Sequence, residues 1–272
     1  MKNLIQRIIT GTIYVSCVFI GLLIHPFVFF GVFLLFMSFT LYEFYDIAKQ
    51  ITQTSFNTFF GIIFSATIFT LFFIDAFSYA HIPLLPILLV LFFGFLSVEL
   101  YLKDTHFFQK LAYTALGILY ITIPFSSVSY IVAKNSFSGE LMCGFFIIIW
   151  SHDTFSYIWG VNIGKHPLVP KISPKKTIEG FIGGFLSTIL IVVLITRFFS
   201  YGLSPIQWIV AAIIIVVFAT IGDVFESLLK RQANKKDSSH LLPGHGGFLD
   251  RFDSAIFSIP AFFAYLHVIS VL

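Results

Sequence analysis

Charged residues are scarce in this chain, since Asp, Glu, Lys and Arg make up only 11% of its 272 residues. In a soluble domain about a quarter of the residues are charged, so this scarcity excludes a soluble domain with a single anchor. The alternating pattern of an outer-membrane barrel is also lacking, and helices are then the way to satisfy the backbone in lipid. The sequence therefore predicts an all-α, polytopic integral membrane protein.

Cysteine is rare as well. The two cysteines, Cys17 and Cys143, both lie in apolar runs. This position favours packing roles over a disulfide, a redox pair or a thiolate metal site. Low-complexity tracts and clear repeats are absent, and no signal-peptide cleavage site follows the basic residues Lys2 and Arg7. The first apolar run is expected to remain as a membrane helix.

What the chain has in abundance is long apolar runs. About nine are long enough to cross a bilayer, which takes roughly 17–25 residues of helix. The break at His25-Pro26 is predicted to be a tight hairpin, because one helix over 6–44 would be about 58 Å long and exceed the bilayer thickness. The expected spans are 6–24, 26–44, 57–74, 83–101, 110–132, 140–161, 178–199, 205–229 and 252–271.

Lysine and arginine divide unequally between the two sides of this arrangement. All sixteen fall on one side except Lys134 and Arg197. Because basic residues mark the cytoplasmic side, we expect a cytoplasmic N-terminus and a C-terminus on the opposite side of the cell (inner) membrane. Merging the first two spans would only move Lys2 and Arg7 across, giving twelve against four instead of fourteen against two, so nine spans are preferred.

Two pairs of acidic residues flank the cytoplasmic loop 230–251. Asp223 and Glu226 precede it, Asp250 and Asp253 end it, and the i,i+3 spacing puts each pair on one helix face. Asp223 is expected about 10 Å below the end of its helix, where the pairs converge. Carboxylates at this depth take up protons or bind a cation, and oxygen ligands favour Mg²⁺. The alternative is an N-cap at Asp250 and salt bridges to neighbouring arginines.

The other polar cytoplasmic loop, 162–177, contains the run Ser173-Pro174-Lys175-Lys176. Ser173 is predicted to cap the next helix and Pro174 to occupy its first position. A helix N-terminus beside Lys175 and Lys176 suits an anion. An ordinary cap with positive-inside lysines explains the segment equally well.

The remaining candidates are polar groups whose surroundings the sequence leaves open. The run Gly244-His245-Gly246-Gly247 either lets the backbone approach a ligand or forms a flexible tip. Asp153 is ionisable in mid-span and so a functional candidate, with hydrogen bonding to a neighbouring Ser or Tyr as the alternative. Glu43 and Asp46 lie near a helix end and are expected to be interfacial.

These motifs together resemble one family. The chain reads Ser227-x-Leu229-Lys230-Arg231, Lys236-Asp237-x-Ser239 and Leu242-Pro243-x-His245-Gly246-Gly247-Phe248-x-Asp250-Arg251-Phe252-Asp253, preceded by Ser173-Pro174-Lys175-Lys176-Thr177-x-Glu179-Gly180 and Gly222-Asp223. This order and spacing is similar to that of the phosphatidate cytidylyltransferases, also called CDP-diacylglycerol synthases, over roughly residues 150–260. Ser239 stands where the family often has Gly, and Ser156 where it usually has Ala.

The resemblance implies that CTP and phosphatidic acid give CDP-diacylglycerol and pyrophosphate. It implies Mg²⁺ and, often in the family, a monovalent cation such as K⁺ and a homodimer. Asp223 and Asp250 are the implied metal ligands and catalytic residues, with Asp253 and Lys236 as further catalytic residues. The implied substrate-binding residues are Ser173, Lys175, Lys176, Lys230, Arg231, His245, Gly246, Gly247, Arg251 and Asp153.

The chain is expected to divide into N-terminal membrane helices, 1–139, for scaffold, lipid access and oligomer contacts, and a catalytic region, 140–272. The expected partners are CTP, phosphatidic acid, the lipid bilayer and a second copy of the chain, and no nucleic acid. Two other functions stay open: a CTP-dependent polyprenol or lipid kinase, and an ion-coupled transporter. Charge crowded on one side disfavours the transporter, which needs polar or broken helices across the membrane.

Overall fold

The computed structural model is a bundle of helices, and each expected span corresponds to a helical segment. It describes residues 2–54, 57–79, 82–101, 106–133, 137–197, 202–244 and 246–272, with side chains from residue 6 onward except that of Glu99. The helices are α1 (Lys2–Leu23), α2 (Pro26–Thr52), α3 (Thr58–Ala76), α4 (Leu84–Tyr101), α5 (Phe107–Gly117), η1 (Ile118–Thr122), α6 (Ile123–Ala133), α7 (Glu140–Ile163), α8 (Ile178–Thr196), α9 (Pro205–Gln232) and α10 (Leu249–Val268). Helices α5, η1 and α6 follow one another directly and form one segment.

Seven of these segments, counted over the described residues, are long and apolar enough to cross a membrane. Helix α4 contributes only a shorter apolar stretch, Leu84–Val98. Helix α10 begins with a charged turn that contains Asp250, Arg251 and Asp253. The polytopic all-α class is therefore confirmed, whereas the count of nine spans is not.

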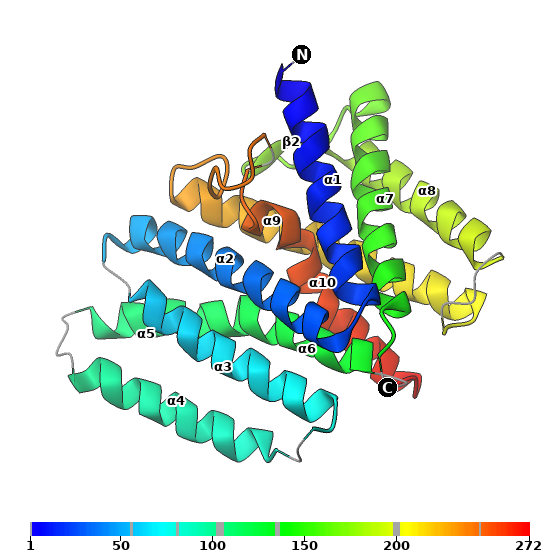
Figure 1. Cartoon of the computed structure of the whole chain (residues 1–272). Helices are drawn as coiled ribbons and strands as arrows, with labels where there is room; N and C mark the ends of the chain where they lie inside the picture. The colour runs from blue at the N-terminus through cyan, green and yellow to red at the C-terminus, as the bar shows by residue number, and fades with distance from the viewer. Residues whose placement is uncertain are drawn as a thin grey trace.

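The chain passes back and forth between two sides of the bundle, as Figure 1 shows. The N-terminus, the end of α7 and strand β2 lie toward the top of that view, and the start of α7 and the C-terminus lie toward the lower right. The hairpin expected at His25-Pro26 is confirmed, because α1 ends at Leu23 and α2 begins at Pro26. The His25 ring nitrogen Nδ1 caps α2 by accepting a hydrogen bond from the Phe27 N–H at 3.3 Å.

The loop 162–177 contains a small antiparallel sheet that the sequence did not predict. Its strands are β1 (Pro167–Val169) and β2 (Ser173–Thr177). The expected cap at Ser173 with Pro174 in the first helical position is wrong, since Thr177 is the N-cap of α8 and its hydroxyl accepts from the Gly180 N–H at 3.1 Å. A residue before proline favours extended backbone, and pairing with β1 keeps Ser173 and Pro174 in a strand.

Small residues allow close packing in the helix pairs α7–α8 and α9–α10. A Cβ atom added to Gly184 of α8 would collide with the Ser156 side chain of α7. A Cβ atom on Gly222 of α9 would lie 2.5 Å from the backbone oxygen of Asp253 in α10. Glycine lets helix backbones approach in this way, and it brings Asp223, next in sequence, beside the first turns of α10.

Candidate active site between helices α7, α8, α9 and α10

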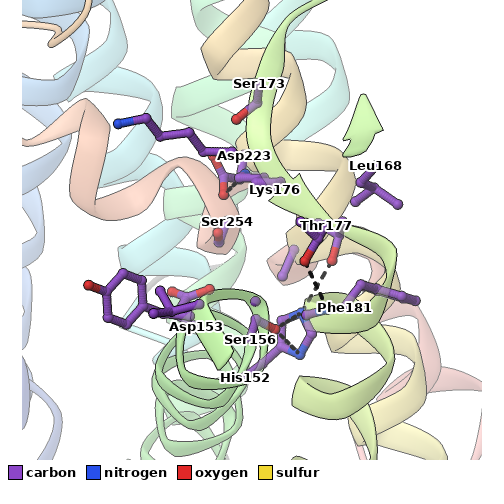
Figure 2. Close-up of a pocket in the computed structure, with 17 residues that line it drawn as sticks. His152, Asp153, Ser156, Leu168, Ser173, Lys176, Thr177, Phe181, Asp223 and Ser254 are labelled. Carbon is purple, nitrogen blue, oxygen red and sulfur yellow. Dashed lines mark hydrogen bonds and ion pairs between the residues drawn. The ribbon is translucent and has the colours of Figure 1, made fainter. Parts of the chain in front are cut away.

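A cavity of about 620 Å³ lies among α7, α8, α9, α10 and the β1–β2 sheet. Figure 2 shows its walls, with Asp153 on α7, Lys176 on β2, Asp223 on α9 and Ser254 on α10 directed toward a common space. Five of the predicted site residues line it, and they come from three separate parts of the sequence: Asp153, Ser173, Lys175, Lys176 and Asp223.

Lys176 and Asp223 form an ion pair on the wall of this cavity. Each side chain remains about 30% exposed, at 30% and 28%, so a ligand in the cavity can reach both. Burial lowers the pKa of the Lys176 ammonium, while neighbouring carboxylates, Asp253 foremost, oppose the shift. Lys176 is thus a cation that is held between acids and open to an anionic ligand.

Three carboxylates come together beside this ion pair. Asp223, Glu226 and Asp253 each offer an oxygen, and these oxygens lie within 4.8 Å of one another. Glu226 is fully buried, at 0% exposed. The Lys230 ammonium lies 2.5 Å from Glu226 Oε2 and is its ion-pair partner. We call these three residues the acid group; oxygen ligands this close suit a divalent cation.

Asp250, predicted with Asp223 as a metal ligand, lies outside the acid group in this structure. Its Oδ1 accepts a hydrogen bond from Lys230 at 2.6 Å. Its Oδ2 accepts from the backbone N–H and the hydroxyl of Ser238, at 3.0 and 2.9 Å, and from the Gly247 N–H at 2.7 Å. Asp250 therefore joins the loop between α9 and α10 to Lys230, which in turn contacts Glu226.

Four predicted cationic residues lie outside the cavity lining, and one of them, Lys230, contacts the acid group as described above. Arg231 donates from Nη1 to the Lys235 carbonyl at 3.0 Å and from Nε to the Ile172 carbonyl at 3.5 Å, so it connects the end of α9 with the β1–β2 turn. Lys236 and Arg251 are exposed. Their proposed contacts with substrate stay predictions.

The loop between α9 and α10 has glycines at positions where neighbouring side chains approach the backbone closely. Gly246 has a positive φ of 78°, and a Cβ atom there would lie 2.5 Å from Asp250 Oδ2. A Cβ atom on Gly247 would collide with the side chains of Ser238 and Glu43. His245 lies outside the described residues, so its role as a ligand contact stays a prediction.

Sequence reasoning missed several residues here. Glu43 is buried inside the protein, 1% exposed, and contacts the loop between α9 and α10. The cavity is also lined by His152, whose ring lies 3.3 Å from the Ser156 hydroxyl and 3.4 Å from that of Thr220. Thr220 could have been found from the sequence, because it stands one turn before Asp223 and the i,i+3 spacing puts both on one helix face. No comparable signal marked Glu43, since its partners are remote in sequence.

Comparison with known proteins gives a consistent result. Residues 5–269 match the cytidylyltransferase family. The chain is 38% identical over 173 residues to the phosphatidate cytidylyltransferase of Staphylococcus haemolyticus, covering 64% of this chain and 65% of that protein. It is 36% and 37% identical over 186 residues to the enzymes of the same name from Staphylococcus saprophyticus and Staphylococcus epidermidis, covering 68% of this chain and 70% of each relative. The matched segment thus spans about two thirds of these relatives.

Proposed function

We propose that this chain, which belongs to the cytidylyltransferase family, is a phosphatidate cytidylyltransferase that makes CDP-diacylglycerol and pyrophosphate from CTP and phosphatidic acid. One observation carries the proposal: the acid group lies beside Lys176 and Lys230 at the edge of a cavity of about 620 Å³. Carboxylates that hold a divalent cation next to ammonium groups that bind phosphates are what nucleotidyl transfer requires.

The acid group fits a divalent cation, and we propose Mg²⁺. Buried Glu226 shares the Lys230 ammonium with Asp250, and three carboxylates this close to one another repel unless further positive charge lies between them. Asp223 is common to the acid group and to the pair of ligands that the resemblance implies; Asp250 remains a proposed ligand in a rearranged site. A monovalent cation such as K⁺ and a homodimer complete the proposal.

The reaction leaves little covalent work for the protein. A phosphatidate oxygen attacks the α-phosphorus of CTP, and the bond from that phosphorus to the pyrophosphate oxygen breaks. Lys175 and Lys176 line the cavity where phosphates would lie, so they hold the two anions against their mutual repulsion and align them. When bound, the cation would neutralise charge on the attacking and leaving oxygens.

The membrane position supports the same proposal. Asp223 of the acid group and the β1–β2 sheet line the same cavity, and we infer that this end of the helices is the cytoplasmic side of the cell membrane. CTP arrives there from the cytoplasm, attracted by the basic loops, and the phosphatidate headgroup lies at this depth in the bilayer. Both substrates can then meet without crossing the membrane.

The decisive experiment is mass-spectrometric product analysis of the purified protein in detergent with CTP, phosphatidic acid and Mg²⁺. We expect CDP-diacylglycerol and pyrophosphate in equal amounts, and neither product when EDTA exceeds Mg²⁺. Release of CDP with a phosphorylated lipid would instead identify a kinase. Ion flux into liposomes by folded protein that turns over no CTP would identify a transporter.

A further inference from the structure

Glu43, on α2, is a buried carboxylate that reaches across to the catalytic region. It lies in the N-terminal part of the chain, far in sequence from the motifs, and is 1% exposed. Its neighbour one turn along, Asp46, forms an ion pair with Lys235 at 2.6 Å but is 44% exposed. Helix α2 thus contacts the loop between α9 and α10 at one buried and one exposed acid.

Both oxygens of Glu43 are occupied by donors from that loop. Oε1 accepts from the Ser239 hydroxyl at 2.6 Å and from the Phe248 N–H at 2.9 Å. Oε2 accepts from the Ser238 hydroxyl at 2.7 Å and from the Leu249 N–H at 2.8 Å. Four donors meet one carboxylate, two hydroxyls from the middle of the loop and two backbone N–H groups where the loop enters α10, so Glu43 ties the middle of the loop to the start of that helix.

Two of these donors are backbone groups at the start of α10. Phe248 is the N-cap and Leu249 the first helical residue, and no side chain of the N-cap residue caps the helix. The first N–H groups of a helix need acceptors and favour a negative charge. Glu43 supplies both from another helix and thereby fixes where α10, and with it Asp250 and Asp253, begins.

The contact continues into the acid group. Ser238, whose hydroxyl donates to Glu43, donates its backbone N–H to Asp250 Oδ2 at 3.0 Å. Asp250 Oδ1 accepts from Lys230, and Lys230 pairs with Glu226. A shift of the loop is thus transmitted to the ammonium that balances the buried acid.

We propose that Glu43 is a positioning residue for the transfer reaction: it fixes the loop between α9 and α10, and through Ser238 and Asp250 it sets the place of Lys230 beside the acid group. This role rests on the proposed function. The substitution Glu43→Gln keeps the size of the side chain but removes the charge and replaces one accepting oxygen by a donating amide, so it cannot serve all four donors.

The first measurement needs no substrate. Hydrogen–deuterium exchange of loop residues 237–249 in the purified protein is expected to be faster in Glu43→Gln than in the unsubstituted protein, with exchange elsewhere unchanged. Asp46→Asn is the matched control, because it alters a half-exposed ion pair to the same loop from the same helix, and exposed pairs contribute little. Its loop exchange is expected to match that of the unsubstituted protein.

The second measurement is steady-state kinetics per folded enzyme. Loss of a supporting contact around a metal site lowers activity about 10–100-fold, and we expect such a fall in kcat for Glu43→Gln, with KM for phosphatidic acid within about twofold of that of the unsubstituted protein. Asp46→Asn should keep both constants. A purely structural role would lower yield and melting temperature while leaving kcat per folded enzyme unchanged, and that result would overturn the proposal.

If Glu43→Gln does not fold, Ser239→Ala removes one of the four donors at a half-buried position. Faster loop exchange together with a lower kcat supports the proposal, and unchanged values of both overturn it. Failure of the proposed function is distinguishable, because an unsubstituted protein without transferase activity still yields the exchange comparison.

Discussion

Lys176 of β2 and Asp223 of α9 form an ion pair on the cavity wall, which joins the two motif-bearing segments of the chain (Figure 2). In this arrangement the Lys176 ammonium is paired with Asp223, one member of the acid group. A divalent cation bound there would compete with Lys176 for Asp223. Lys176 would then be released toward the phosphates, so that cation binding and substrate binding support each other.

The acid group predicts how activity depends on Mg²⁺. We expect Asp223→Asn to lower turnover more than about 100-fold, because the variant loses a ligand charge in a site where charge neutralisation dominates. Glu226→Gln is expected to raise the Mg²⁺ concentration at half-maximal activity about tenfold or more. Mg²⁺ titrations of both variants, compared with Glu140→Gln at the exposed start of α7, measure this.

Gel filtration should show that all three variants remain folded. Equal Mg²⁺ requirements in Glu226→Gln and the unsubstituted protein would remove Glu226 from the ligand set. If Asp250→Asn instead shifted the Mg²⁺ requirement, the ligand pair that the resemblance implies would be favoured.

The alkaline side of the pH profile should report on Lys176. Burial lowers the pKa of this ammonium, so it loses its proton and its phosphate-binding charge below about pH 10.4, the value for a free lysine. We expect kcat/KM to fall as pH rises through the lowered pKa. Lys176→Arg keeps a charge that does not titrate in this range, so its profile should extend to higher pH.

Lys175→Arg is the matched control, since Lys175 is the exposed neighbour on the same strand. Its profile should fall at the same pH as that of the unsubstituted protein, whatever its absolute rate. An identical alkaline limb in Lys176→Arg would mean that another group sets it.

Close packing of α9 on α10 should make Gly222 intolerant of a methyl group. Its Cβ atom would lie 2.5 Å from the Asp253 carbonyl oxygen and 3.0 Å from Phe257 Cβ, so Gly222→Ala must separate the helices. Overpacking of this kind costs about 1–3 kcal/mol, and the melting temperature in detergent should fall. Gly94→Ala, where nothing lies within 4 Å of the added atom, serves as the control; an equal fall in both variants would contradict the packing argument.

The membrane orientation can be tested by cysteine labelling. In a variant with Cys17→Ala and Cys143→Ala, we introduce Lys49→Cys near the end of α2 or Glu140→Cys at the start of α7, both exposed positions. A membrane-impermeant maleimide added to intact cells is expected to label Glu140→Cys, and to label Lys49→Cys only after permeabilisation. The opposite pattern would invert the proposed topology.

The sequence by itself determined the structural class of the protein and much of the order of its helices along the chain. Low charge and long apolar runs leave helices as the solution in lipid, and the His25-Pro26 break was predicted because a single helix there would exceed the bilayer. Asp223 and Glu226 were placed on one face because helical spacing is a local property. Local rules failed at Ser173, where pairing with a strand outweighed the helix-capping preference.

Only the tertiary structure decided which acids meet. The sequence ranked Asp250 above Glu226, but the packing of α9 on α10 at Gly222 puts Glu226 with Asp223 and Asp253 and turns Asp250 toward the loop. Glu43 was beyond sequence reasoning for the same reason: its four donors lie about two hundred residues away. Periodicity reports which face of a helix a residue occupies, whereas the partner of that face depends on how the helices pack.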